Sequence, residues 1–239
     1  MEDVNYDHIF QIEQDNWWYK SKRDLWDRIL KKTNKRFSSA LDIGCGVGSN
    51  LKILEKYSQN VQGIDYSEKA IDYCRKKKYQ HVSIGDVHHL NINNKYDLIL
   101  CSDILEHVDD NKAMQEISKV LKSGGWLIFS VPAHKYLWND NDDLSQHQRR
   151  YEKKELIKLL SKEFKIIKLS YWNFSLFFPT YLIYQLQKLK KNRTKTNNLN
   201  LIPKWMNTIL YFILKIENRL FQKINLPQGI SLVGIAIKK

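Results

Sequence analysis

The segment Leu41–Asn50, which reads Leu-Asp-Ile-Gly-Cys-Gly-Val-Gly-Ser-Asn, constrains the fold of this chain more than any other feature. It follows a short apolar run and opens a helical pattern over Ser49–Tyr57. Glycines at such a turn let the backbone bend tightly and approach a ligand without a Cβ in the way. Asp65 ends the next apolar run, where a carboxylate can accept hydrogen bonds from both hydroxyls of a ribose. The sequence therefore predicts an α/β fold that binds a nucleoside.

Apolar runs and helical patterns alternate along the chain from about residue 39. The expected strands are Ser39–Ile43, Asn60–Ile64, His81–Ile84, Tyr96–Cys101, Gly125–Val131, Lys165–Trp172 and Ile230–Lys238. The expected helices are Asp15–Lys32, Ser49–Tyr57, Ser67–Lys78, Asp110–Leu121 and Lys153–Glu163. Alternation of this kind predicts βαβ units and a parallel sheet, with five strands before Pro132 and two after it.

Composition supports a globular protein with an uneven charge distribution. Of the 239 residues, 43% are hydrophobic, which is enough for a sizeable core. Three widely spaced cysteines, and a start without a basic-then-apolar pattern, predict a cytoplasmic protein without a disulfide framework. Residues 151–239 carry 17 Lys and Arg against 4 Asp and Glu, whereas residues 1–150 are balanced. The net charge of +13 therefore lies in the last third, which indicates an anionic neighbour, either nucleic acid or phospholipid.

The spacing of the glycines narrows the choice of ligand. Gly44, Gly46 and Gly48 fall as G-x-G-x-G, whereas dinucleotide sites use G-x-G-x-x-G with a helix start that faces the pyrophosphate. Asp42 would repel a pyrophosphate, but it suits a cationic ligand such as S-adenosylmethionine, which carries an ammonium and a sulfonium. The spacing therefore disfavours a nicotinamide-dependent oxidoreductase.

Several motifs resemble those of class I S-adenosylmethionine-dependent methyltransferases in content, order and spacing: Asp42–Gly48, Asp65, Gly85-Asp86, Tyr96–Ile99 and Leu121–Gly125. The resemblance covers about residues 39–132. It implies a Rossmann-like sheet of seven strands, the last one antiparallel, with helices on both faces. It also implies that the glycine loop holds the methionyl part of the cofactor, while acids after the next two strands hold the ribose and the adenine. The cofactor-binding residues expected on this basis are Asp42, Gly44, Cys45, Gly46, Gly48, Asp65, Tyr66, Asp86, Val87 and Ser102.

The segment Cys101–Val108 follows the fourth expected strand. Its acid-x-x-Glu-His pattern resembles that of small-molecule O-methyltransferases, including the ubiquinone-biosynthesis enzymes, and it lacks the signatures of nucleic-acid base methylation. Asp103, Glu106 and His107 stand at i, i+3 and i+4, so in a helix they would share one face. Asp103 and His107 are candidate catalytic residues. The three side chains offer ligands for a divalent cation, but internal hydrogen bonds are the expected role and no metal is expected.

The loop Pro132–Tyr151 follows the fifth strand, where α/β proteins place ligands. Its His…Leu-Trp…Asp…His-x-Arg-Arg-Tyr pattern, together with Trp17-Trp18-Tyr19, resembles a bacterial and archaeal methyltransferase subgroup. By analogy with this subgroup the N-terminal aromatics form a lid over the cofactor; the alternative is that they pack in the core. Either His134 or His147 is expected to take the acceptor's proton, because imidazole titrates near neutral pH.

The same loop supplies most of the expected acceptor contacts. The expected substrate-binding residues are Trp18, Tyr19, Trp138, Asp142, Arg149 and Arg150. The arginines would bind a phosphate or carboxylate of the acceptor. A second interpretation pairs both arginines with Asp142 and Asp143, in which case these charges only order the loop.

Four segments are expected in the domain organisation: an N-terminal helical cap (1–36), the S-adenosylmethionine-binding core (37–172), an apolar and basic helical insertion (173–227) and the final strand (228–239). The insertion joins an uncharged run, Leu169–Gln187, to an apolar helix at Pro203–Ile224 through a basic cluster, Lys188, Lys190, Lys191, Arg193 and Lys195. Either the insertion lies on an anionic membrane at its inner face, or it forms a cap or a homodimer interface.

These expectations combine into a methyltransferase that uses S-adenosylmethionine on a small-molecule, glycan or lipid-linked acceptor, at a hydroxyl oxygen. The alternative is a methyltransferase associated with RNA or another nucleic acid, or a non-catalytic S-adenosylmethionine-binding adaptor that uses the basic last third. The missing base-methylation signatures disfavour nucleic acid as a partner. The intact loop Asp42–Gly48 disfavours the adaptor.

Overall fold

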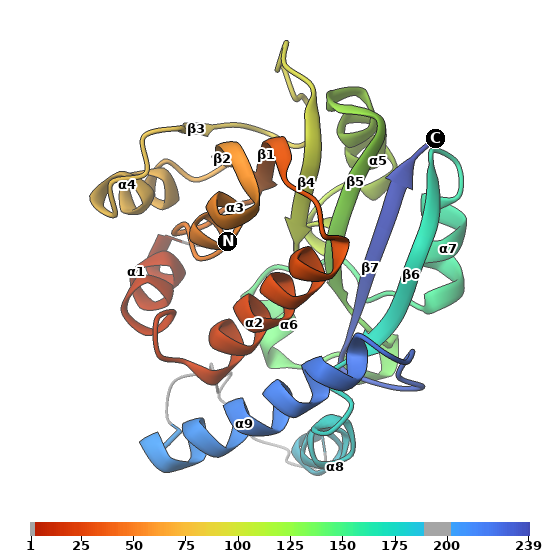
Figure 1. Ribbon diagram of the computed structural model, residues 1–239. Helices are drawn as coiled ribbons and strands as arrows, with labels where there is room; N and C mark the ends of the chain where they lie inside the picture. The colour runs from red at the N-terminus through yellow and green to blue at the C-terminus, as the bar shows by residue number, and fades with distance from the viewer. Residues whose placement is uncertain (1–2, 189–201) are drawn as a thin grey trace.

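The computed structural model describes residues 3–188 and 202–239, which form a central sheet between layers of helices (Figure 1). The seven-stranded sheet has the order β3-β2-β1-β4-β5-β7-β6. The strands are β1 (Phe37–Ile43), β2 (Ser58–Asp65), β3 (Val82–Ile84), β4 (Tyr96–Ser102), β5 (Leu121–Pro132), β6 (Phe164–Trp172) and β7 (Ser231–Lys238). β7 runs antiparallel to both of its neighbours, and the other paired strands are parallel. The predicted Rossmann-like sheet with an antiparallel last strand is confirmed.

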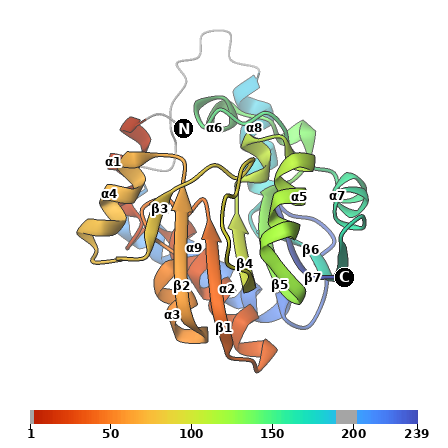
Figure 2. The ribbon, with the colours of Figure 1, turned by 90° about the horizontal axis from the view of Figure 1, so that it is seen from above.

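Helices cover both faces of this sheet, as the view from above shows (Figure 2). The helices of the described residues are α1 (Asp3–Ile12), α2 (Trp17–Thr33), α3 (Leu51–Tyr57), α4 (Glu68–Lys76), α5 (Asp110–Val120), α6 (Asp140–Leu144), α7 (Lys153–Leu160), α8 (Phe177–Lys188) and α9 (Lys204–Phe221). Two short 3₁₀ turns, η1 (Leu105–His107) and η2 (Lys135–Leu137), lie in the loops after β4 and β5. Helices α1 and α6 were not among those expected from the sequence.

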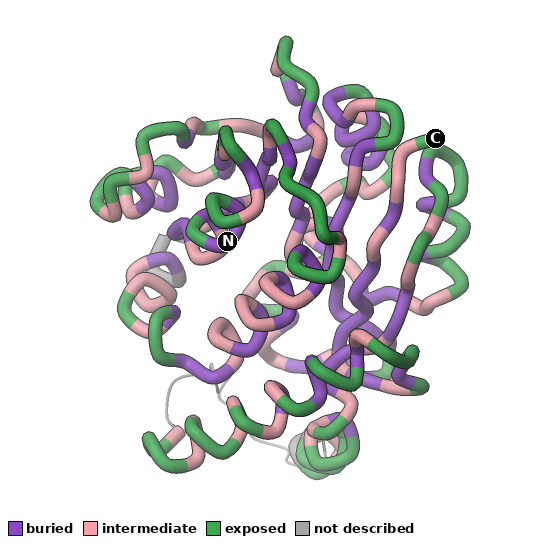
Figure 3. The backbone as a smooth tube through the Cα atoms, in the orientation of Figure 1, coloured by how far each residue is buried: buried purple, intermediate pink, exposed green. Residues whose placement is uncertain are grey.

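The sheet is buried on both faces, which explains why its strands are nearly continuous apolar runs. Along β4, Leu98 and Leu100 pack with α2, α3 and α9, whereas Ile99 and Cys101 pack with α5 and α7. This alternation follows from the two-residue period of a strand. Figure 3 shows the resulting buried centre, with exposed residues on the outer helices.

One expected boundary was wrong. The helix was expected over Asp110–Leu121 and the next strand over Gly125–Val131, but α5 ends at Val120 and β5 begins at Leu121. Leu121 already pairs with Tyr96 of β4, and its side chain is fully buried. Pairing in the sheet therefore ends the helix at Val120.

The insertion packs on the N-terminal helices through α9. Asn218 donates from Nδ2 to the Ser21 carbonyl at 2.9 Å and to Asp24 Oδ2 at 2.8 Å, and its Oδ1 accepts from Trp172 Nε1 at 2.8 Å. Asn218 and Trp172 are fully buried. Helix α9 therefore completes the layer that α2 forms over one face of the sheet.

The outer faces of α8 and α9 are apolar and exposed. Their exposed large side chains are Phe178, Tyr181, Leu182, Ile183, Leu186, Trp205, Ile209, Phe212, Ile216 and Leu220. Within residues 3–188 and 202–239, no helix combines the length and the apolar character that a membrane crossing requires. Of the basic cluster, Lys190, Lys191, Arg193 and Lys195 lie outside the described residues.

Candidate active site

A cavity of about 440 Å³ lies at the carboxyl ends of β1, β2 and β4. Its wall is formed by the glycine loop after β1, by residues that follow β2, β3 and β4, and by side chains of α1 and α2. This edge of a parallel sheet is where open α/β folds bind their ligands. The cavity is therefore the candidate site.

The glycine loop is shaped by its first glycine. Gly44 has a φ of +70°, and a Cβ at that position would lie 1.9 Å from Cδ1 of Ile104, which also lines the cavity. A side chain there would both strain the backbone and displace Ile104. The loop is held by Gly46, whose N–H donates to Asp65 Oδ2 at 2.8 Å.

Asp65 lies at the centre of a small hydrogen-bond network. Its Oδ1 accepts from the Ser67 N–H at 3.0 Å and from the Tyr6 hydroxyl of α1 at 3.2 Å. Burial, followed by the charge of Asp65, raises the pKa of Tyr6. Tyr6 therefore remains a hydroxyl donor, and it occupies a hydrogen-bonding position that a ribose hydroxyl would need. Tyr6 was not among the residues expected from the sequence.

Eight of the ten expected cofactor residues line this cavity: Gly44, Cys45, Gly46, Asp65, Tyr66, Asp86, Val87 and Ser102. Two do not. Gly48 packs against Tyr79 and Cys74 instead. Asp42 is fully buried, and neither of its oxygens has a hydrogen-bond partner among the described residues. Burial, with a further contribution from Asp65, raises its pKa well above the usual range.

A lysine that the sequence analysis missed lies at the far end of the cavity. Lys22 of α2 forms an ion pair with Asp103 and donates to Ser130 Oγ at 3.1 Å, and Ser130 donates to Asp103 Oδ1 at 2.8 Å. Burial lowers the pKa of Lys22. The sequence did contain a pattern that could have identified Lys22. It lies four residues after Trp18 and three before Leu25, which is the spacing of the buried face of the helix. Trp18 and Tyr19 line the same cavity.

Asp103, Glu106 and His107 do not share a helical face, so that prediction was wrong. Asp103 has a φ of +56° and lies outside η1, which begins at Leu105. The turn directs Asp103 toward Lys22, whereas Glu106 and His107 belong to η1.

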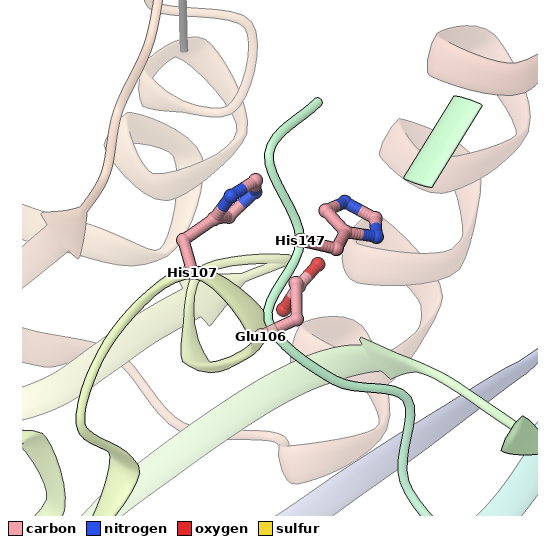
Figure 4. Close-up of side chains that lie close together, drawn as sticks. All are labelled: Glu106, His107 and His147. Atoms are coloured by element: carbon pink, nitrogen blue, oxygen red, sulfur yellow. The ribbon is translucent and has the colours of Figure 1, made fainter. Parts of the chain in front are cut away.

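Glu106 and His107 lie near His147, which comes from the loop after α6 (Figure 4). One ligand atom from each side chain lies within 4.8 Å of the others. Burial raises the pKa of Glu106. Burial, followed by the neighbouring His147, lowers the pKa of His107 to about 4. Of the three, only His107 lines the cavity.

The remaining expected residues of the loop after β5 lie outside the cavity. His134 is buried and stacked on Tyr136 and Tyr171, with ring centroids 4.8 and 4.9 Å away. Trp138 donates from Nε1 to Asp143 at 2.8 Å. Neither side chain is therefore placed to meet a ligand in this cavity.

The paired arginines bind carboxylates within the protein. Arg150 donates from Nε to both oxygens of the buried Asp142, at 2.9 and 3.0 Å. Arg149 pairs with Asp110 at 3.1 Å, not with Asp143. The structure thus favours the interpretation in which these charges order the loop.

Comparison with known proteins identifies the fold and the domain. Residues 41–129 match the family model described as a methyltransferase domain. Residues 41–129 therefore form a methyltransferase domain, and the chain has the fold of S-adenosylmethionine-dependent methyltransferases. An S-adenosylmethionine-dependent methyltransferase from Clostridium acetobutylicum superposes with a TM-score of 0.58 at 17% identity, covering 92% of this chain and 91% of that one. The N-methyltransferase NodS from Bradyrhizobium japonicum, solved with S-adenosyl-L-homocysteine, gives 0.53 at 21% identity over 65% and 79%.

Relatives in sequence match part of this chain. A ubiquinone biosynthesis O-methyltransferase from Hydrogenovibrio crunogenus is 34% identical over 105 residues, which are 40% of this chain and 43% of that enzyme. An uncharacterized protein from Methanocaldococcus jannaschii is 31% identical over 158 residues, which are 64% and 65% of the two chains. The chain therefore spans less than half the length of the ubiquinone-biosynthesis enzyme that it matches.

Proposed function

We propose that the protein transfers the methyl group of S-adenosylmethionine to a hydroxyl oxygen of a small-molecule, glycan or lipid-linked acceptor. One observation carries this proposal: the eight expected cofactor residues line the same cavity as three ionisable side chains, Lys22, Asp103 and His107. A volume of about 440 Å³ is in the usual range for ligand pockets. The similarity to ubiquinone-biosynthesis O-methyltransferases supports oxygen as the acceptor atom.

The cofactor supplies an activated methyl group, so the protein has to align the acceptor and remove one proton. The acceptor oxygen forms a bond to the methyl carbon while the carbon–sulfur bond breaks, and the electron pair remains on sulfur. We assign the acceptor's proton to Asp103, whose side chain is about one-third exposed at the cavity wall. Lys22, next to Asp103, stabilises negative charge that develops on the acceptor oxygen.

The test begins with the cofactor and then identifies the acceptor. S-Adenosylmethionine should raise the melting temperature of the protein, because a ligand that binds only the folded state stabilises it. Labelled-methyl transfer into lipid, glycan and RNA extracts should then label the lipid or glycan fraction at an alkali-stable ether. Labelled RNA, or a protein that binds the cofactor and labels nothing, would contradict the proposal.

We also propose that the exposed apolar face of α9, Trp205, Ile209, Phe212, Ile216 and Leu220, rests on an anionic lipid surface. Its residues recur at helical spacing, and Lys204, Lys215, Arg219 and Lys223 lie beside them in a segment rich in positive charge. Apolar insertion and attraction to anionic lipid act together at such a surface.

The protein should bind vesicles that contain phosphatidylserine and should release them as salt rises, because the attraction is screened over roughly 8 Å in physiological salt. Replacing Phe212 and Ile216 with serine should remove most of the binding in a vesicle sedimentation assay. The same change at Ile157, an exposed residue of α7, is the control. Unchanged sedimentation of the α9 variant, or a dimer held by this face, would refute the lipid proposal.

A further inference from the structure

We infer that Glu106, His107 and His147 form a binding site for a divalent transition-metal ion of the zinc type. Two imidazole nitrogens and one carboxylate oxygen come together there, within 4.8 Å of one another. Ligand atoms around a tetrahedral zinc lie about 3.4 Å apart, given bonds of roughly 2.0–2.2 Å. Figure 4 shows that the Glu106 carboxylate points toward the space between the two rings, so small side-chain rotations would close the site.

The carboxylate of Glu106 supplies an independent reason to expect a cation. Glu106 is 1% exposed, and neither oxygen has a hydrogen-bond partner among the described residues. A buried carboxylate without partners is costly, whereas metal coordination satisfies it. Two buried cations, Lys22 and Arg150, are near enough to influence Glu106, but Lys22 pairs with Asp103 and Arg150 pairs with Asp142.

The Nδ1 nitrogen of His147 is hydrogen-bonded to a carboxylate, an arrangement that is usual for metal-binding histidines. Nδ1 lies 2.7 Å from Oδ1 of Asp142, which is buried and is itself bound by Arg150 Nε. A hydrogen bond from Nδ1–H to a carboxylate leaves the lone pair of Nε2 free for a metal, and such partners usually accompany metal-binding histidines. This gives Asp142 and Arg150, which do not reach the cavity, a role in orienting a ligand.

The ligand set indicates which ions fit. Two histidines and one glutamate are found in catalytic zinc sites, where a fourth position stays open for water or substrate. Imidazole ligands favour zinc and similar ions over magnesium or calcium, which prefer oxygen. Here His107 and Asp103 both line the cavity, so a position left open on the metal would face the acceptor. This part of the inference rests on the proposed function: a metal there would lower the pKa of the acceptor's hydroxyl before Asp103 takes its proton.

The test uses the full chain after dialysis against a chelator. Calorimetric titration with zinc should give one site per chain, and cobalt substituted for zinc should give the strong visible absorption of a tetrahedral ion. His147→Ala and Glu106→Gln should each weaken zinc binding at least tenfold. His89 lies outside the cluster and contacts Lys112, so His89→Ala should leave zinc binding unchanged. Glu106→Gln is nearly isosteric and removes only a buried charge, so it should fold even if His147→Ala does not.

Binding of S-adenosylmethionine is measured on the same metal-free protein, so the two proposals can fail separately. Cofactor binding without zinc binding would overturn the metal site alone. Zinc binding without cofactor binding would overturn the proposed function alone. Zinc binding that all three variants keep would show adventitious surface binding and would also refute the site.

Discussion

Asp103→Asn is expected to lower methyl transfer by about 100-fold or more while leaving the affinity for S-adenosylmethionine nearly unchanged. Proton removal by a positioned side chain contributes roughly 10²–10⁴-fold to a rate, and asparagine keeps the shape of the side chain but accepts no proton. The measurement is labelled-methyl transfer into the acceptor fraction, with cofactor affinity determined by calorimetry. Among the described residues, the ion pair and side-chain hydrogen bonds of Asp103 go to Lys22 and Ser130 and not to the glycine loop.

Asp27→Asn provides the matched control, because Asp27 also pairs with a lysine, Lys56, but lies away from the cavity. It should keep full activity. A loss of less than tenfold for Asp103→Asn would show that the proton leaves by another route. The histidines His134 and His147 would then be tested by alanine substitution, with a selective loss of turnover identifying the base.

Asp65→Ala is expected to weaken S-adenosylmethionine binding by about 100-fold. Two hydrogen bonds from the ribose to a charged acceptor are each worth roughly 1.5–3 kcal/mol, and about 1.4 kcal/mol corresponds to a factor of ten. The variant also frees the Gly46 N–H and the Tyr6 hydroxyl, which Asp65 binds in this structure. Calorimetry measures the affinity, and circular dichroism checks that the variant remains folded.

Asp72→Ala removes an exposed carboxylate of α4 that pairs with Arg75, so it should leave the affinity unchanged. Equal affinities for Asp65→Ala and the unsubstituted protein would disprove the ribose assignment. Tyr6→Phe offers a further comparison, because it removes the hydroxyl that competes for Asp65 Oδ1 and should bind the cofactor at least as tightly.

The sheet could be predicted because local patterns specify it. The glycine loop, the apolar strands and the intervening helices each appear in short stretches of sequence. The spacing of the apolar residues in each stretch indicates whether it forms a helix or a strand. The boundary at Leu121 was wrong because pairing with Tyr96, which is distant in sequence, ends the helix.

The cofactor end of the site was also predictable, since its residues follow directly after strands. The acceptor end was not, because it depends on contacts between distant segments. Lys22 meets Asp103 across 81 positions of sequence, and His147 meets Glu106 through a loop that is anchored by Asp142. The positive φ of Asp103 separates it from Glu106, although the i, i+3 spacing suggested a shared face.

The hydrogen bonds of Asn218 have a consequence for engineering this chain. A designer who trimmed residues 173–226 to obtain a minimal catalytic unit would remove the partner of the Trp172 indole and uncover Ser21 and Leu25 of α2. The shortened product would expose a large aromatic surface and would aggregate rather than fold. Chimeras with other members of the family should therefore exchange the first 36 residues and the insertion as a matched pair.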